Sequence, residues 1–190
     1  MALTKIAWVR NGAAGFYELR DSAGAIRRPL IQGFMEATAD VFEEAKRSDG
    51  YICHALKPEP TKPSFGQVYG EFGEFIMPRF YKGGTQQGEL TQAATLSLWE
   101  RIEAVRRFAY GGLHKRALDR RTDWFLKPAW PTYVMWWLAD GYVPTWSEAS
   151  QRLEHLHDFG PTPHAFNFGT SFNPDGMRVS TTRALSPSNA

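Results

Sequence analysis

The sequence lacks the features that define several large protein classes. One cysteine, Cys53, occurs in 190 residues, which excludes an intrachain disulfide and a cysteine-based zinc site. No apolar run approaches the ~20 residues that a membrane helix requires. The N-terminus lacks the basic segment and apolar run of a signal peptide. We therefore expect a cytoplasmic protein without membrane contact.

Charge of one sign is also scarce. Lys and Arg number 22 against 20 Asp and Glu, a net charge of +2. This balance does not favour nucleic-acid binding, which needs a clustered basic surface. No G-x-G-x-x-G or G-K-[ST] phosphate cradle is present, and the G-x-S-x-G elbow of hydrolases is absent. The motifs therefore support neither a nucleotide cofactor nor a serine hydrolase.

Aromatic residues, in contrast, are abundant. They make up 14% of the chain, with 13 Phe, 7 Tyr and 7 Trp, and six of the tryptophans fall between Trp99 and Trp146. One compact domain needs fewer rings than this for its core. Some of them are therefore expected to line a pocket or an interface.

Hydrophobic periodicity predicts alternating strands and helices. Strands are expected at residues 3–9, 51–56, 93–97, 132–138 and 164–168, and helices at residues 30–46, 98–109, 113–126 and 146–159. Ser97 with Glu100, and Thr145 with Glu148, match capping boxes at two helix starts. The strand at 132–138 is apolar on both faces, so it should be central or covered on both sides.

This order suggests an α+β fold, a ferredoxin-like split βαβ sheet with helices on one face. We expect one domain over residues 1–168 with a long loop insertion at 57–90, and a C-terminal extension at 169–190. The loop, in which one short strand is expected at 75–77, holds six aromatic residues and should pack as a lid or dimer contact. The polar extension should be loose by composition.

The second half of the chain resembles a known family. The runs LSLWERIEAVRRFAYGGLHKRALDRRTDWF, YVMWWLADGYVPTWSEASQRLEHL and FGPTPHAFNF are similar to the domain of unknown function 3291 family. That resemblance implies the dimeric α/β-barrel superfamily, which includes antibiotic-biosynthesis monooxygenases. Its members form homodimers and bind small molecules between each sheet and its helices. The 57–90 loop and the residues after Gly169 depart from the family pattern.

One set of polar residues suits acid–base chemistry. His114, Arg121 and Phe125 share one face of the expected helix, and Trp124 lies beside them. Tyr110 lies four residues before His114. As catalytic residues, His114 would move a proton, Arg121 would stabilise an oxyanion and Tyr110 would supply a phenol. The alternative is that His114 and Arg121 bond to backbone carbonyls and hold the helices together.

Further residues are candidates for substrate binding. Trp124 would stack on a flat ring, and one of the adjacent indoles, Trp136, would face the pocket while sheet core remains the alternative. His54 is expected on the opposite strand face from Tyr51 and Cys53, pointing into the pocket of His114; a satisfied or surface histidine is the alternative. Phe34 on the first helix and Tyr81 in the loop complete the set.

Metal and haem sites have weaker sequence support. His155 and His157 point roughly 200° apart on a helix and do not chelate one ion together. We therefore expect no metal and no cofactor, with haem bound by a histidine such as His164 as the alternative.

The pattern as a whole predicts an enzyme of natural-product metabolism. Its substrate would be a hydrophobic aromatic, polyketide- or terpene-like molecule, and its chemistry an isomerisation, cyclisation, elimination or monooxygenation driven by proton transfer. The alternatives are a haem-binding or haem-degrading protein and a non-catalytic ligand-binding protein.

Overall fold

The computed structural model describes residues 3–11, 28–59, 62, 64, 66–80, 94–121 and 130–179. Its centre is a four-stranded antiparallel sheet in the order β2-β3-β1-β4. The strands are β1 (Leu3–Asn11), β2 (Tyr51–His54), β3 (Ala94–Trp99) and β4 (Tyr133–Ala139). Each connection between parallel strands passes over one strand of opposite direction: β1 to β2 crosses β3, and β3 to β4 crosses β1.

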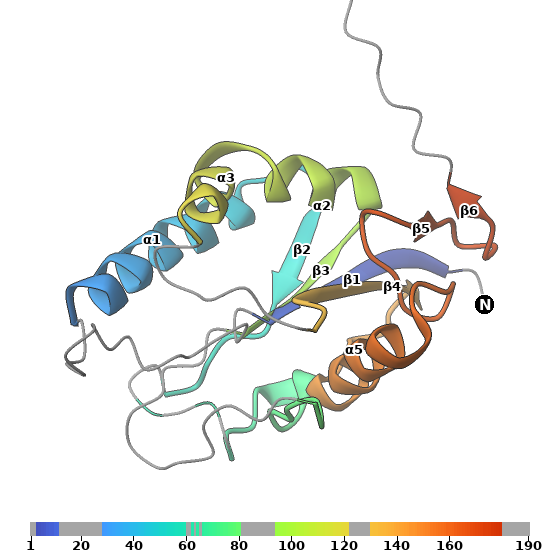
Figure 1. Cartoon of the computed structure of the whole chain (residues 1–190), viewed down its shortest axis with the longest axis horizontal. Coiled ribbons are helices and arrows are strands. Elements are labelled where there is room, and N and C mark those ends of the chain that lie inside the picture. Colours follow the sequence, from blue (N-terminus) through green and yellow to red (C-terminus); the bar gives the residue numbers. More distant parts are fainter. Residues whose placement is uncertain are drawn as a thin grey trace, which may run out of the picture.

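Three helices cover one face of this sheet, and Figure 1 shows them together above the strands. They are α1 (Arg28–Lys46), α2 (Ile102–Ala109) and α3 (Gly112–Asp119). We call this side the α1 face. Its strand residues alternate with those of the other side, and the buried ones pack on the helices. They include Ile6, Trp8, Trp99 and Met135.

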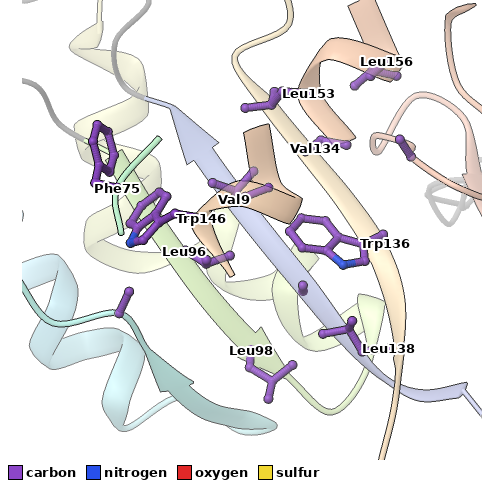
Figure 2. Packing of buried hydrophobic residues seen from close by; sticks show 14 of the residues in the cluster. Val9, Phe75, Leu96, Leu98, Val134, Trp136, Leu138, Trp146, Leu153 and Leu156 are labelled. Atoms are coloured by element: carbon purple, nitrogen blue, oxygen red, sulfur yellow. The ribbon is translucent and has the colours of Figure 1, made fainter. Parts of the chain in front are cut away.

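The other side, which we call the α5 face, is covered as well. Helix α5 (Trp146–Phe159) and residues 69–77, with the short 3-10 helix η1 (Gly70–Phe72), pack on it (Figure 1). Figure 2 shows Trp136 and Trp146 among the aliphatic side chains of this face. The expectation of helices on one face only is therefore wrong, because a sheet that is apolar on both faces needs cover on both.

The capping predictions had opposite outcomes. Thr145 is the N-cap of α5, and its hydroxyl accepts a hydrogen bond from the Glu148 N–H at 3.2 Å. Ser97 instead lies buried inside β3, where its hydroxyl donates to the Trp8 carbonyl and accepts from Trp99 Nε1. Helix α2 starts only at Ile102, so the first capping box is wrong because sheet pairing extends β3 to Trp99.

Sheet residues 133–139 form an edge strand whose free side is partly covered. The Met135 and Phe166 backbones exchange two hydrogen bonds, at 2.8 and 2.9 Å. This isolated bridge replaces the expected strand at 164–168.

The C-terminal extension was expected to be loose, but the structure differs: β5 (Ser171–Phe172) pairs with β6 (Arg178–Val179), and the Phe172 carbonyl accepts from Trp137 Nε1. Tertiary contacts thus hold the extension as far as Val179.

A further local expectation is corrected. Residues 75–77 form no strand; the described part of the loop contains η1 and an isolated bridge between Val68 and Glu74. At the end of α5, Phe159 is 73% exposed, while Ala149, Leu153 and Leu156 are buried. Within the described part of the chain, no helix has the length and apolarity needed to cross a membrane.

Candidate functional site

His114 lies in the first turn of α3 and is buried against the α1 face. Its Nδ1 is 2.7 Å from the Ala109 carbonyl oxygen, and since that oxygen only accepts, Nδ1–H is the donor. Its ring lies beside Phe108 and Trp8, with ring centroids 4.9 and 5.6 Å away. In the neutral imidazole this bond places the remaining lone pair on Nε2, the atom that a base or a ligand would use.

Helix α3 is held in place by a carboxylate from another helix. Glu44 of α1 accepts hydrogen bonds from the N–H groups of Leu113 and His114, the shortest at 2.9 Å. These are N–H groups of the first turn, which have no partner inside the helix. Gly112, at φ +47°, lets the carboxylate approach, because a Cβ there would lie only 2.7 Å from Glu44 Cδ. Glu44 therefore fixes the backbone that carries His114.

A second histidine on the same face is paired with a phenol. The Tyr51 hydroxyl is hydrogen-bonded to Nδ1 of His54, and the His54 ring stacks on Phe42 at 4.7 Å. The two residues share a face because the register shifts between Tyr51 and Cys53, a β-bulge that adds one residue to β2. The expectation that Tyr51 and His54 lie on opposite faces is therefore wrong, whereas Cys53 does lie on the α5 face.

Burial sets the protonation of this pair. Desolvation lowers the pKa of His54, and the nearby Lys46 ammonium lowers it further, so the imidazole is neutral at pH 7. Desolvation also raises the pKa of Tyr51 to about 12, which keeps the phenol protonated. A neutral phenol can donate to Nδ1 or accept from Nδ1–H; we assign the first arrangement, in which the His54 proton is on Nε2.

The sheet register joins the two histidines. His54 is opposite Ser97, and Ser97 is opposite Trp8, whose ring contacts His114. Both imidazoles thus face the helical layer of α1, α2 and α3. With Nδ1–H donating to Ala109, neutral His114 has its lone pair on Nε2, and in the arrangement that we assign, neutral His54 has its proton on Nε2.

The other predicted catalytic residues lie nearer the surface. Tyr110 caps the C-terminus of α2, is 49% exposed and packs its ring on Phe168 at 5.4 Å. Arg121 is exposed and donates to the Leu118 carbonyl at 2.9 Å. The side chains of Arg121 and His114 thus both bond to backbone carbonyls, which agrees with the alternative that they hold the helices together.

The substrate-binding candidates are not all brought together. Trp136 is fully buried on the α5 face, with the Arg152 guanidinium 5.7 Å from its ring, so the sheet separates it from His114. Trp124, Tyr81 and the side chain of Phe34 lie outside the described part of the structure. Of the expected residues that the structure describes, His54 shares the face of His114 and Trp136 does not.

Sequence reasoning missed three residues that shape this site: Trp8, Tyr51 and Glu44. The period-two alternation of the first strand places Ile6 and Trp8 on one face and would have found Trp8. Tyr51 and Glu44 gave no signal, because a bulge and a contact between distant helices create their roles.

The remaining histidines form separate contacts on and near α5. His155 Nε2 is 2.9 Å from the Thr162 hydroxyl, His157 pairs with Asp158, and His164 lies 2.7 Å from an Arg152 nitrogen. Among the residues that the structure describes, no group of three His, Cys, Asp or Glu side chains is placed to hold a metal ion.

Comparison with known proteins gives one match. A family model described as a domain of unknown function (DUF3291) covers residues 17–182. Neither the comparison with curated proteins nor that with solved structures gives a match.

Proposed function

The chain belongs to the DUF3291 family, and from that premise we propose that it is a small-molecule enzyme that moves protons on a hydrophobic aromatic substrate. The substrate would lie between the α1 face of the sheet and the helices. The reaction would be an isomerisation, cyclisation, elimination or monooxygenation in natural-product metabolism, without a metal or cofactor.

One observation carries this proposal: two histidines are buried among aromatic rings on one sheet face, and a hydrogen bond holds Nδ1 of each. His114, whose Nδ1–H donates to the Ala109 carbonyl, is assigned as the base, and His54, which is bonded to the Tyr51 hydroxyl, is assigned as the donor. A base and a donor on one apolar surface are what the removal and return of a proton at carbon require. The surrounding rings of Trp8, Phe108 and Phe42 suit an aromatic substrate.

The strand order also supports the proposed superfamily. Order β2-β3-β1-β4 with two crossovers is what a ferredoxin-like split βαβ sheet would have, and we propose the dimeric α/β-barrel assembly on this basis. A homodimer in the cytoplasm is part of the same proposal, and the single cysteine suits a reducing compartment.

The test is exchange of an acidic C–H with solvent. A panel of enolisable aromatic ketones, beginning with anthrone and 1-tetralone, is incubated with the protein in D2O, and NMR follows loss of the C–H signal. Positioned general bases contribute about 10²- to 10⁴-fold, so we expect a comparable acceleration for at least one ketone. His114→Asn should abolish it, because the Asn amide can still donate to Ala109 but offers no base.

Two controls separate the alternatives. His157→Asn changes an exposed histidine of α5 and should exchange as the wild type does. Hemin is added to the same preparation: a Soret shift that disappears in His114→Asn would favour haem binding instead. The proposal is refuted if no ketone exchanges above the buffer rate, or if His114→Asn exchanges at the wild-type rate in a folded protein.

A further inference from the structure

The indole of Trp8 has an unused hydrogen-bond donor beside His114. Trp8 is only 3% exposed, and its Nε1 is buried with no hydrogen-bond partner among the described residues. Burying such a donor without a partner is unfavourable, so a buried N–H of this kind calls for an explanation.

The same face satisfies its other two indoles. Trp99 Nε1 donates to the Ser97 hydroxyl at 2.9 Å, and Trp137 Nε1 donates to the Phe172 carbonyl at 2.7 Å. Ser97, the polar neighbour of Trp8 in the sheet, donates to the Trp8 carbonyl and accepts from Trp99, and makes no hydrogen bond to the Trp8 indole. Within the described part of the chain, two indoles of the α1 face thus have acceptors and the third has none.

We propose that Trp8 Nε1 donates a hydrogen bond to an oxygen of the substrate, which makes a ring-attached carbonyl or phenolate oxygen a requirement of the substrate class. This proposal rests on the proposed function and refines it. It assigns the oxyanion role to Trp8, because Arg121 is exposed and bonded to the Leu118 carbonyl.

The chemistry of the step balances without a co-reactant. His114 Nε2 takes the proton from carbon, the C–H electron pair forms a carbon–carbon double bond, and the carbonyl π pair moves onto oxygen. Negative charge therefore develops on the oxygen that Trp8 holds, where a fixed donor in a water-poor site stabilises it most. The ring centroids of Trp8 and His114 are 5.6 Å apart, so the two side chains are neighbours on the α1 face, where the proposed substrate would contact both.

A matched ligand pair isolates this hydrogen bond. Anthrone carries a carbonyl where 9,10-dihydroanthracene carries a methylene group on the same three-ring skeleton, and its acidic C–H lies across one ring from that carbonyl. A single net hydrogen bond corresponds to roughly tenfold in affinity. Equilibrium dialysis of the wild-type protein should therefore show anthrone bound about tenfold more tightly than dihydroanthracene.

Trp8→Phe should remove this preference and leave the affinity for dihydroanthracene nearly unchanged. The control is Trp146→Phe, which removes another buried, unpartnered indole N–H, but on the α5 face, where Phe75 and Tyr69 pack against it. That variant should keep the tenfold preference. If Trp8→Phe does not fold, 3-benzothienylalanine at position 8 replaces N–H by sulfur at nearly the same volume and gives the same readout.

The outcomes separate the two proposals. The inference about Trp8 is overturned if the wild type does not discriminate between the two ligands, including by binding neither, or if the variants at position 8 keep the preference. If the preference depends on Trp8 but His114→Asn exchanges normally, the oxygen site stands and the acid–base function fails. If exchange depends on His114 while substitutions at position 8 do not change the ligand preference, the acid–base function stands and Trp8 does not hold the substrate oxygen.

Discussion

Because Glu44 contacts the start of α3, substitutions of Glu44 and of Gly112 should have non-additive effects on the free energy of unfolding, and this coupling can be measured. Glu44→Ala removes a charged acceptor from two backbone N–H groups at a helix N-terminus. Loss of an N-cap costs about 0.5–2 kcal/mol, and the charge at the helix terminus adds to that. We expect about 1.5 kcal/mol, which for a chain of this length lowers Tm by about 3–6 °C.

Gly112→Ala should cost more, for two reasons. At φ +47° an alanine pays about 1 kcal/mol for the left-handed conformation. Its Cβ would also displace the Glu44 carboxylate, since Glu44 Cδ would lie only 2.7 Å away. The side chain can rotate away, but the cap is then lost, so the total is about 2.5 kcal/mol.

The double variant distinguishes this explanation from a purely local backbone effect. Once Glu44 is absent, Gly112→Ala has only the conformational cost. The double variant should therefore lose about 2.5 kcal/mol of unfolding free energy rather than the about 4 kcal/mol expected from the sum of the single variants, which is a coupling of about 1.5 kcal/mol. Urea unfolding of the four proteins measures it. Glu43→Ala, which removes an exposed carboxylate paired with Lys46, serves as the control and should leave the midpoint unchanged. Additive losses in the double variant would refute the cap.

Two other substitutions test neighbouring conclusions. Burial lowers the folded-state pKa of His54, so between that pKa and the unfolded value near 6.5 the unfolded chain binds more protons, and stability should fall as the pH drops through 6.5. In His54→Gln the urea midpoint should fall less steeply over that range. Equal slopes in the two proteins would mean that His54 titrates as in the unfolded chain. Thr145→Ala should cost about 1 kcal/mol, or about 2–4 °C in Tm, because the Glu148 N–H loses its acceptor. Ser147→Ala, two residues further along the chain, should show no such drop in calorimetry. Equal effects of the two substitutions would mean that Thr145 does not stabilise α5 as its N-cap.

Local patterns predicted the elements of the fold well. Alternating and three-four periodicities located β1, α1, β2, β3, α2, β4 and α5, since each pattern follows from which side chains face the core. The capping box at Thr145 could be predicted for the same reason, because its two residues are only three positions apart in the sequence. The box at Ser97 failed because pairing with β1 continued the strand, a tertiary effect that overrode a local signal.

The candidate site was less predictable. His54 and His114 were found from residue type, and their shared face follows the expectation. Trp136 was expected near His114 but lies across the sheet, because a one-residue change in strand register moves a side chain from one face to the other. The same property of strands placed Tyr51 beside His54 once a bulge shifted β2.

The sequence by itself determined which segments form strands and helices, that the core is rich in aromatic rings and that imidazoles are the main titratable groups within it. These properties depend on side-chain type and on spacings of two to four residues. Tertiary structure decided which face each ring occupies, that α5 covers the second face and that Glu44 fixes the backbone of His114. It also decided that the indole of Trp8 has no acceptor among the described residues. Residues 70 and 89 positions apart, such as Glu44 with His114 and Trp8 with Ser97, meet only when the sheet and its helices assemble.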